Sequence, residues 1–298
     1  MAYGYGSAVA PSKVGSGPFA GRLTGAVAVV TGASRGIGKG IAVELGAAGA
    51  TVYLTGRTVA PGGLPGTIGE TVAEIEALGG AGIALRCDHH VDDEVREVFA
   101  RVEREAGRLD VLVNNVFSVP DLAPWIGRPF WDVPIELWDE IVGVGARSHY
   151  VASALAAPLL IRTGGGLIAN ISSSGATRYA QNVLYGIGKA AVDKMTADTA
   201  LELAEHAVAV ISIWPGLVRT ELIEAAVPKD DDGNAFIDFE GARISLRNVE
   251  SPRFAGRAVV ALAADDTRMT RSGTAVTTEA VAAAYGYTDV DGTLPHSS

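Results

Sequence analysis

A tyrosine and a lysine four residues apart, Tyr185 and Lys189, are the pair in this sequence best suited to proton transfer. Residues at this spacing share one face of a helix, with about 5–6 Å between their Cβ atoms. Apolar residues recur at the same spacing, so a helix is predicted even though Gly186 and Gly188 each cost it about 1 kcal/mol. An ammonium about 4 Å from a phenol contributes roughly 4 kcal/mol at an effective dielectric near 20. Such an ammonium would lower the phenol pKa, unless the pair simply lies on a solvated helix face.

The second set of candidate residues is the glycine-punctuated turn TGASRGIG, Thr31 to Gly38. The turn follows the apolar run 26–31 and opens a helix pattern. Backbone amides and the helix dipole at such a position can hold a pyrophosphate, and side chains at Gly32, Gly36 and Gly38 would block its approach. A tight turn that needs glycine for positive φ is the simpler alternative.

Alternating strand and helix patterns must position these motifs. The runs that we predict as strands are 26–31, 51–55, 82–87, 109–115, 164–174 and 208–216, and the helix patterns between them include 70–78, 92–105 and 135–161. This alternation predicts a parallel sheet with right-handed crossovers. We therefore expect an α/β fold, a Rossmann-type doubly wound parallel sheet in a single domain, residues 23–298. Residues 1–22, rich in Gly, Ser, Ala and Pro, are predicted to be a flexible extension.

Composition excludes several classes of function. The formal net charge of −10 provides no basic surface for nucleic acid or an anionic membrane. The single cysteine, Cys87, rules out a disulfide within the chain, and His89 and His90 have no third ligand nearby in the sequence, so no metal site is predicted. No run reaches the roughly 20 apolar residues of a membrane span, and no signal peptide is evident. We expect a cytoplasmic protein.

The motif TGxxxGxG followed by YxxxK resembles the signature of the short-chain dehydrogenase/reductase family, and the resemblance extends from about Leu23 to the C-terminal region. Further stretches match family segments in order: VNN (113–115), with Val116 and Phe117 in place of the Ala and Gly of NNAG; ISSS (171–174), where the family places its catalytic serine; and PGLVRT (215–220), similar to the PGxVxT segment that touches the nicotinamide. Other stretches most resemble one subgroup of the family.

The resemblance implies catalytic roles for three residues. Tyr185 is the acid/base group, Lys189 lowers its pKa and binds the nicotinamide ribose, and a serine orients the substrate oxygen. Alignment on the strand end selects Ser173 as that serine, whereas counting back from the tyrosine selects Ser172. Side chains alternate faces along a strand, so only one of them can point at the site. We favour Ser173, because a deletion in the following loop is easier than a register change in a central strand.

Glycines add two expectations. Gly186 and Gly188 would let cofactor or substrate lie close to the backbone. Gly145 stands seven residues after Trp138, where the family often has an asparagine, so the usual proton relay is in doubt here. A backbone carbonyl could still hold the water of that relay.

The resemblance also implies a nicotinamide dinucleotide cofactor. The residues expected to bind it are Gly32, Ser34, Arg35, Gly36, Ile37, Gly38, Arg57, Asp88, Asn114, Tyr185, Lys189, Pro215, Gly216, Val218 and Thr220. Gly56 stands where NAD enzymes place a carboxylate, and two arginines without a nearby acid suit a 2′-phosphate, so NADP(H) is predicted over NAD(H). Arginines on an ordinary surface are the alternative. Asp88 matches the residue that contacts adenine in the family.

The function expected from these residues is an NADP(H)-dependent oxidoreductase acting on a small-molecule carbonyl or secondary alcohol. A non-catalytic NADP-binding sensor or scaffold, and an epimerase or dehydratase, are the alternatives. A homo-oligomer, dimer or tetramer, is expected, because the apolar stretch 154–161 lies on a helix that family members commonly use for assembly. The segments that would select the substrate, 117–133 with its Trp125, Phe130 and Trp131, and the acidic stretch 229–241, a candidate lid, carry no recognised motif.

Overall fold

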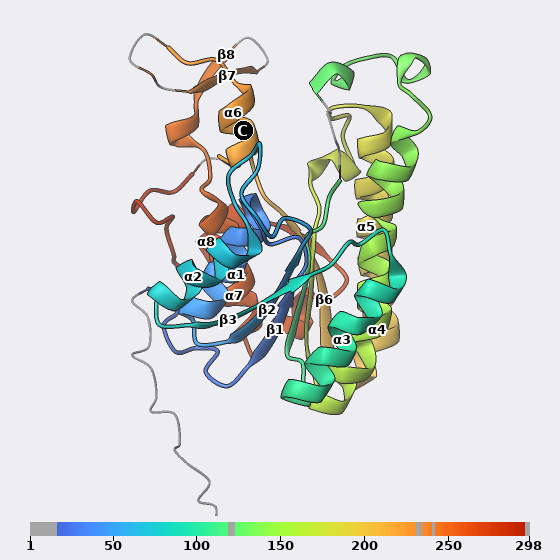
Figure 1. Ribbon diagram of the computed structural model, residues 1–298, viewed down its shortest axis with the longest axis vertical. Helices are drawn as coiled ribbons and strands as arrows, with labels where there is room; N and C mark the ends of the chain where they lie inside the picture. The colour runs from blue at the N-terminus through green and yellow to red at the C-terminus, as the bar shows by residue number, and fades with distance from the viewer. Residues whose placement is uncertain (1–16, 119–122, 231–232, 234, 240–241, 296–298) are drawn as a thin grey trace, which may run out of the picture.

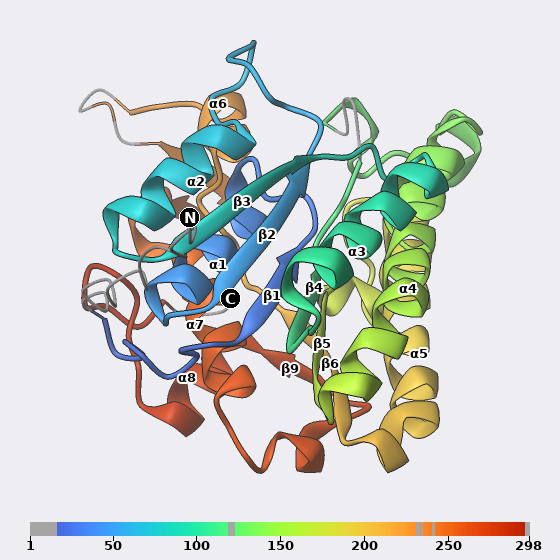
Figure 2. The ribbon, with the colours of Figure 1, turned by 60° about the horizontal axis from the view of Figure 1, so that its bottom comes forward.

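The computed structural model of the chain describes residues 17–118, 123–230, 233, 235–239 and 242–295. Its centre is a seven-stranded sheet of order β3-β2-β1-β4-β5-β6-β9, in which every neighbouring pair is parallel (Figures 1 and 2). The strands are β1 (Val27–Val30), β2 (Thr51–Gly56), β3 (Ala81–Arg86), β4 (Val111–Asn114), β5 (Gly166–Ile171), β6 (Val208–Trp214) and β9 (Ala275–Thr277). The strand order reverses between β1 and β4, which confirms the predicted doubly wound topology.

Helices cover both faces of this sheet (Figure 2). One layer contains α1 (Gly36–Ala47), α2 (Ile68–Ala77), α7 (Pro252–Ala263) and α8 (Thr278–Tyr285), and the other contains α3 (Asp92–Ala106), α4 (Arg147–Thr163) and α5 (Val183–Leu203). The short helix α6 (Glu221–Ala226) and an antiparallel hairpin, β7 (Phe236–Phe239) with β8 (Ala242–Ser245), lie together at one end of the molecule (Figure 1).

The two layers explain the continuous apolar runs of the sequence. In β1, Ala28 and Val30 belong to the core beneath α1 and α7, whereas Val27 and Val29 belong to the core beneath α3, α4 and α5. All four residues are buried, because a parallel strand covered by helices on both sides presents no face to water. The ends of these strands are therefore fixed positions from which polar side chains can be aimed.

The predicted long helix over residues 135–161 is interrupted. A π-helical turn, Asp139–Val144, comes first, and α4 begins only at Arg147. At Gly145 between them, a Cβ atom would lie 2.3 Å from the carbonyl oxygen of Ile141, so this backbone path requires glycine. A periodic pattern of apolar residues does not reveal such a local widening of the helix.

Two predicted flexible segments are described only in part. Residues 1–16 of the predicted extension lie outside the described residues, whereas residues 17–22 form turns, and the ring of Phe19 packs edge-on against Tyr287 with centroids 5.6 Å apart. In the candidate lid, residues 231–232, 234 and 240–241 lie outside the described residues, and strand β7 forms part of the rest.

Helices α1 and α7 approach each other closely at two glycines. A Cβ atom on Gly40 would lie 2.2 Å from the carbonyl oxygen of Pro252, and one on Gly256 would lie 2.6 Å from the carbonyl oxygen of Gly40. The backbones themselves are therefore in contact at this crossing. Any side chain there must push the two helices apart.

Gly40→Ala is expected to destabilise the fold by about 1–3 kcal/mol, because overpacking outweighs the better helix propensity of alanine. The measurement is urea unfolding followed by circular dichroism. Gly69→Ala in α2 is the matched control, because the nearest atom to its Cβ would be Thr67 Oγ1 at 3.9 Å, and no loss of stability is expected there. Equal unfolding free energies for the two variants would contradict the close backbone contact.

Candidate active site

Tyr185 is held on the first turn of α5 by local contacts. The side-chain oxygen of Asn182 caps the helix by accepting a hydrogen bond of 2.9 Å from the backbone N–H of Tyr185. A Cβ atom on Gly175 would lie 2.6 Å from the Tyr185 ring, so the ring rests directly on that backbone. The phenol O–H donates to Ser173 Oγ at 2.9 Å, and Ser173 also accepts from the backbone N–H of Gly175 at 3.1 Å. Tyrosine and serine are thus fixed as one unit.

The two candidate serines point in different directions. Ser173 contacts Tyr185, whereas Ser172 is 3% exposed and donates through its Oγ to the backbone carbonyl of Lys189 at 3.3 Å. The geometry favours Ser173 for chemistry beside the tyrosine, as alignment on the strand end did. Ser172 instead fastens β5 to α5.

The ammonium of Lys189 is buried beneath the tyrosine. Its Nζ donates to the carbonyl oxygen of Ile171 at 3.1 Å, and the residue is 8% exposed. Burial lowers the pKa of Lys189 to about 8, although the charge of Asp193 acts in the opposite direction. Lys189 is therefore charged at neutral pH and loses its charge as the pH rises through about 8.

In this structure the pKa of Tyr185 is raised rather than lowered. Burial raises the pKa of Tyr185, and the hydrogen bond with Ser173 lowers it only in part. The ammonium is directed at the carbonyl of Ile171, and its Nζ lies 5.7 Å from the centre of the tyrosine ring. The phenol consequently stays protonated through neutral pH, which suits a proton donor.

Gly186 and Gly188 lie beside protein backbone. A Cβ atom on Gly186 would lie 3.4 Å from the carbonyl oxygen of Gly175, and one on Gly188 would lie 3.4 Å from the carbonyl oxygen of Ile141. Both distances are ordinary contacts, so α5 packs here against the backbone of Gly175 and of the π-helical turn without requiring glycine. That cofactor or substrate lies close to this part of the backbone stays a prediction.

The glycine-rich turn between β1 and α1 requires its glycines. Gly32 and Gly36 have φ values of +68° and +57°, and a Cβ atom on Gly38 would lie 2.3 Å from the carbonyl oxygen of Gly32. The backbone N–H of Gly36 donates to a carboxylate oxygen of Glu221 at 2.8 Å. Ile37, by contrast, packs against the core. An anionic group therefore already occupies the start of α1.

The segment Pro215–Thr220, which follows β6, reaches the same place. Thr220 Cγ2 lies 3.4 Å from the position of a Cβ on Gly36, and Val218 is 4% exposed. The segment is fixed by Glu250, whose side chain accepts from the backbone N–H of Gly216 at 2.8 Å. Sequence reasoning missed Glu250, because it lies more than thirty residues away in the sequence. Burial raises the pKa of Glu250 to about 7.

The two arginines predicted to bind a phosphate lie on the loops after β1 and β2. Arg35 donates to the carbonyl oxygen of Gly66 at 2.9 Å and to Thr58 Oγ1 at 3.2 Å, and its Nε is buried without a partner among the described residues. Ser34 lies beside Gly56, with its Cβ 3.5 Å from the position of a Cβ there. Ser34 and Arg35 therefore lie beside the end of β2 and the loop that follows it, and their binding of a phosphate stays a prediction.

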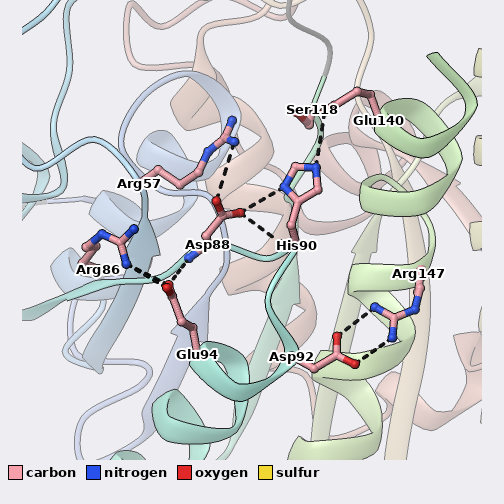
Figure 3. A network of polar contacts seen from close by, with 9 residues as sticks. All are labelled: Arg57, Arg86, Asp88, His90, Asp92, Glu94, Ser118, Glu140 and Arg147. Carbon is pink, nitrogen blue, oxygen red and sulfur yellow. Dashed lines mark hydrogen bonds and ion pairs between the residues drawn. The ribbon is translucent and has the colours of Figure 1, made fainter. Parts of the chain in front are cut away.

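The expectation that no acid lies near the arginines is wrong. The guanidinium of Arg57 lies 4.0 Å from Asp88 Oδ2, and the other carboxylate oxygen, Oδ1, accepts hydrogen bonds from the backbone and ring of His90 (Figure 3). Burial alone would raise the pKa of Asp88, but the bonds from His90 and the charge of Arg57 lower it overall. Figure 3 shows that His90 continues the network to Glu140, at 3.5 Å, which accepts from Ser118.

The two neighbouring asparagines at and after the end of β4 differ in what their side chains contact. Asn114 is 0% exposed, and its amide donates to Ser153 Oγ at 2.9 Å and to the side chain of Asn170 at 2.8 Å, so this side chain braces the sheet from within. Asn115, which sequence reasoning did not single out, donates to the carbonyl oxygen of Gly32 at 2.9 Å. It therefore supports the glycine-rich turn directly.

The remaining candidate residues are a pair of exposed aromatic side chains and a buried histidine. Phe130 and Trp131 are 63% and 71% exposed, with their rings in edge contact. His89 is bonded to Thr55 Oγ1 at 2.8 Å, and burial lowers its pKa to about 4. No group of three or more His, Cys, Asp or Glu residues able to hold a metal ion occurs among the residues that the structure describes. Within that part of the chain, no helix is both long and apolar enough to cross a membrane.

The chain belongs to the short-chain dehydrogenase family, whose sequence model matches residues 26–231. The predicted family is thereby confirmed. The chain is similar to dehydrogenase/reductase SDR family member 1 of Mus musculus, with 43% identity over 272 residues, 91% of this chain and 85% of that protein. The stretches TGASRGIG, VYLTGR, VPIELWDEI, YGIGKAA and GYTDVDG had predicted resemblance to this subgroup and its bacterial relatives.

Two solved structures have the same fold. A 7 alpha-hydroxysteroid dehydrogenase complexed with NADH and 7-oxo glycochenodeoxycholic acid has a TM-score of 0.71 and 25% identity, covering 92% of this chain and 96% of that one. A metagenomic short-chain oxidoreductase in complex with NADP has a TM-score of 0.66 and 30% identity, covering 86% of this chain and 97% of that one. Family and fold together define an oxidoreductase with a nicotinamide cofactor.

The two serines give a matched pair of substitutions. Ser173→Ala is expected to lower turnover of a carbonyl substrate by roughly 10²-fold, because one positioned hydroxyl beside the reacting oxygen is lost. Ser172→Ala removes only a bond between β5 and α5, so it is expected to cost about 1 kcal/mol of stability and leave turnover within a few-fold. The readouts are absorbance of the reduced nicotinamide cofactor and thermal unfolding, and the opposite order of turnover losses would assign the role to Ser172.

Proposed function

We propose that this protein is an NADP(H)-dependent oxidoreductase that transfers hydride between nicotinamide and a carbonyl or secondary alcohol. The observation that supports the proposal most is the 2.9 Å hydrogen bond between Tyr185 Oη and Ser173 Oγ. Two hydroxyls held together in this way can both donate to one substrate oxygen. Membership of the short-chain dehydrogenase family supports the same reaction type.

The residues of the glycine-rich turn fit a dinucleotide. The carboxylate of Glu221 already accepts from the backbone N–H of Gly36 at 2.8 Å, so an anionic oxygen fits at the start of α1. We expect the pyrophosphate of the cofactor to bind there in place of Glu221, beside Thr220. Lys189 would hold the nicotinamide ribose. The bound nicotinamide supplies or accepts the hydride.

The choice of NADP(H) over NAD(H) is supported by the charges at the end of β2. Gly56 provides no carboxylate for a ribose hydroxyl, and the side chain of Arg57 is 58% exposed. Its pairing with Asp88 is long, at 4.0 Å, and an exposed pair of this kind contributes little, so the guanidinium can still bind a phosphate. Arg35 Nε, buried without a partner in the described structure, is a further donor nearby.

The proton chemistry follows from the protonation states. In the reducing direction hydride adds to the carbonyl carbon, and the carbonyl oxygen takes its proton from Tyr185 while Ser173 donates to the same oxygen. The phenolate that remains is stabilised by the nearby charge of Lys189. Since that charge is lost as the pH rises through about 8, reduction is favoured below this value.

We also propose a homo-oligomer assembled through α4 and α5. Within the apolar stretch 154–161, the buried residues are Ala156, Leu159 and Leu160. Ile161 is 36% exposed, and Tyr150 and Leu201 are 61% and 78% exposed on the same pair of helices. Such side chains are suited to burial against a second copy. A monomeric mass in light scattering at micromolar concentration would contradict this assembly.

The cofactor preference predicts that NADPH binds more tightly than NADH and that Arg57→Ala weakens NADPH binding by about tenfold, because a charge-assisted contact is lost. Calorimetry measures both affinities. Arg86→Ala is the matched control, since the side chain of Arg86 is also 58% exposed but pairs with Glu94. Equal affinities of the wild-type protein for the two cofactors would reject the preference.

The proposed reaction predicts that Tyr185→Phe keeps the fold and NADPH binding but lowers turnover by roughly 10²–10⁴, the contribution of general acid catalysis. A screen of carbonyl compounds with NADPH, read by nicotinamide absorbance, supplies the substrate. Tyr179→Phe serves as the control, because Tyr179 is 71% exposed. A Tyr185→Phe enzyme with wild-type turnover, under conditions where hydride transfer limits the rate, would show that another group donates the proton.

A further inference from the structure

Phe117 is an aromatic residue inside the candidate active site that no step of the proposed reaction has used. It follows the end of β4 by three residues and is 40% exposed. Its ring stands edge-on to the ring of Tyr185, with an interplanar angle of 89° and centroids 5.8 Å apart, within the preferred range for aromatic pairs. Phe117 therefore packs against the ring that carries the phenol hydroxyl.

The same ring faces the buried ammonium. Nζ of Lys189 lies 5.1 Å from the centre of the Phe117 ring, within the range of a cation–π interaction. The hydrogen bond to the carbonyl of Ile171, at 3.1 Å, uses one of the three N–H groups of the ammonium. The ring thus covers a second side of the ammonium that water would otherwise reach.

The position of the ring depends on a glycine in the loop before α4. Phe117 Cδ2 lies 3.1 Å from the place where a Cβ atom on Gly145 would be. A longer side chain at that position would displace the ring from Lys189. The ring of Phe117 therefore lies where it does because residue 145 has no side chain.

We propose that Phe117 is a positioning residue whose ring shields the Lys189 ammonium from water and holds it, together with Tyr185, in place. Its catalytic relevance rests on the proposed function, since Lys189 and Tyr185 are the pair assigned there to ribose binding and proton donation. The ring acts on the ammonium in two opposing ways. Its π face stabilises the charge, and its volume keeps out the water that would stabilise the charge more.

Few other charges in the described structure bear on Lys189. On its own helix, Asp193 favours the charged form of Lys189, and Tyr185 is protonated through neutral pH. From α4, His149 faces it, but burial lowers the pKa of His149 to about 3, so this imidazole is neutral throughout the range in which Lys189 titrates. The carboxylate of Asp193 is held in place because it accepts hydrogen bonds from Ser212 Oγ and Trp214 Nε1. Substitutions at Phe117 therefore alter the surroundings of Lys189 without changing these charges.

The test is a pH titration of the Lys189 side chain by NMR in protein labelled with ¹⁵N-lysine, with the signal assigned by its loss in Lys189→Met. Phe117→Leu keeps an apolar side chain but loses the π face, so the midpoint should fall by about one pH unit. Phe117→Ala admits water, so the midpoint should rise by about one unit toward the ordinary lysine value. Phe117→Tyr retains the ring and should keep the wild-type midpoint.

Opposite shifts for leucine and alanine support the proposal, because general loosening of the fold would move both midpoints toward the ordinary value. Shifts in the same direction, or none, would overturn it. If Phe117→Ala does not fold, the comparison of leucine with tyrosine still decides, since only leucine should lower the midpoint. The titration needs neither substrate nor cofactor. Opposite shifts in a protein that reduces no carbonyl compound would leave the role of Phe117 intact and reject the proposed function.

Discussion

The buried ammonium of Lys189 is the constraint on which the rest of the site depends. A charge that is 8% exposed must be compensated locally, and here the carbonyl at the end of β5, the Tyr185 ring and the Phe117 ring surround it. Each of these groups comes from a different part of the sequence. They meet because a parallel sheet covered on both faces brings the carboxyl ends of β4 and β5 to one edge, where α5 begins. The fold therefore places the charge of Lys189 in a site of low dielectric, where its interaction with neighbouring groups is stronger than in water.

The features that sequence predicted are those with local causes. Strand and helix alternate because apolar runs and helical periodicity are properties of neighbouring residues, and Tyr185 and Lys189 share a helix face for the same reason. Ser173 contacts the tyrosine in the structure, because a strand end fixes which side chain points to which face, and its catalytic role stays a prediction. Glycines with positive φ in the turn after β1 followed from the same kind of argument.

The features that sequence could not reveal depend on residues that are distant in the chain. Glu221 accepts a hydrogen bond from the backbone N–H of Gly36, although the two residues are 185 positions apart in the sequence. Glu250 accepts one from the backbone N–H of Gly216, 34 positions away. The pKa of Tyr185 is raised because burial outweighs the hydrogen bond with Ser173, and only the folded chain shows how deeply the ring is buried. Asp88 proved to lie beside Arg57 for a similar reason, since neighbouring strands placed their ends together.

The central claim is that hydride transfer in this protein requires the charged form of a lysine that burial has made unusually easy to deprotonate. The most direct measurement is the rate of NADPH oxidation in a single turnover between pH 6 and pH 10 (about the range over which a buried lysine titrates), with the carbonyl compound that reacts fastest. The rate is expected to be constant at low pH and to fall as the pH rises through about 8, the pKa of Lys189. A rate that stays constant up to the ordinary pKa of lysine, about 10.4, would contradict the claim.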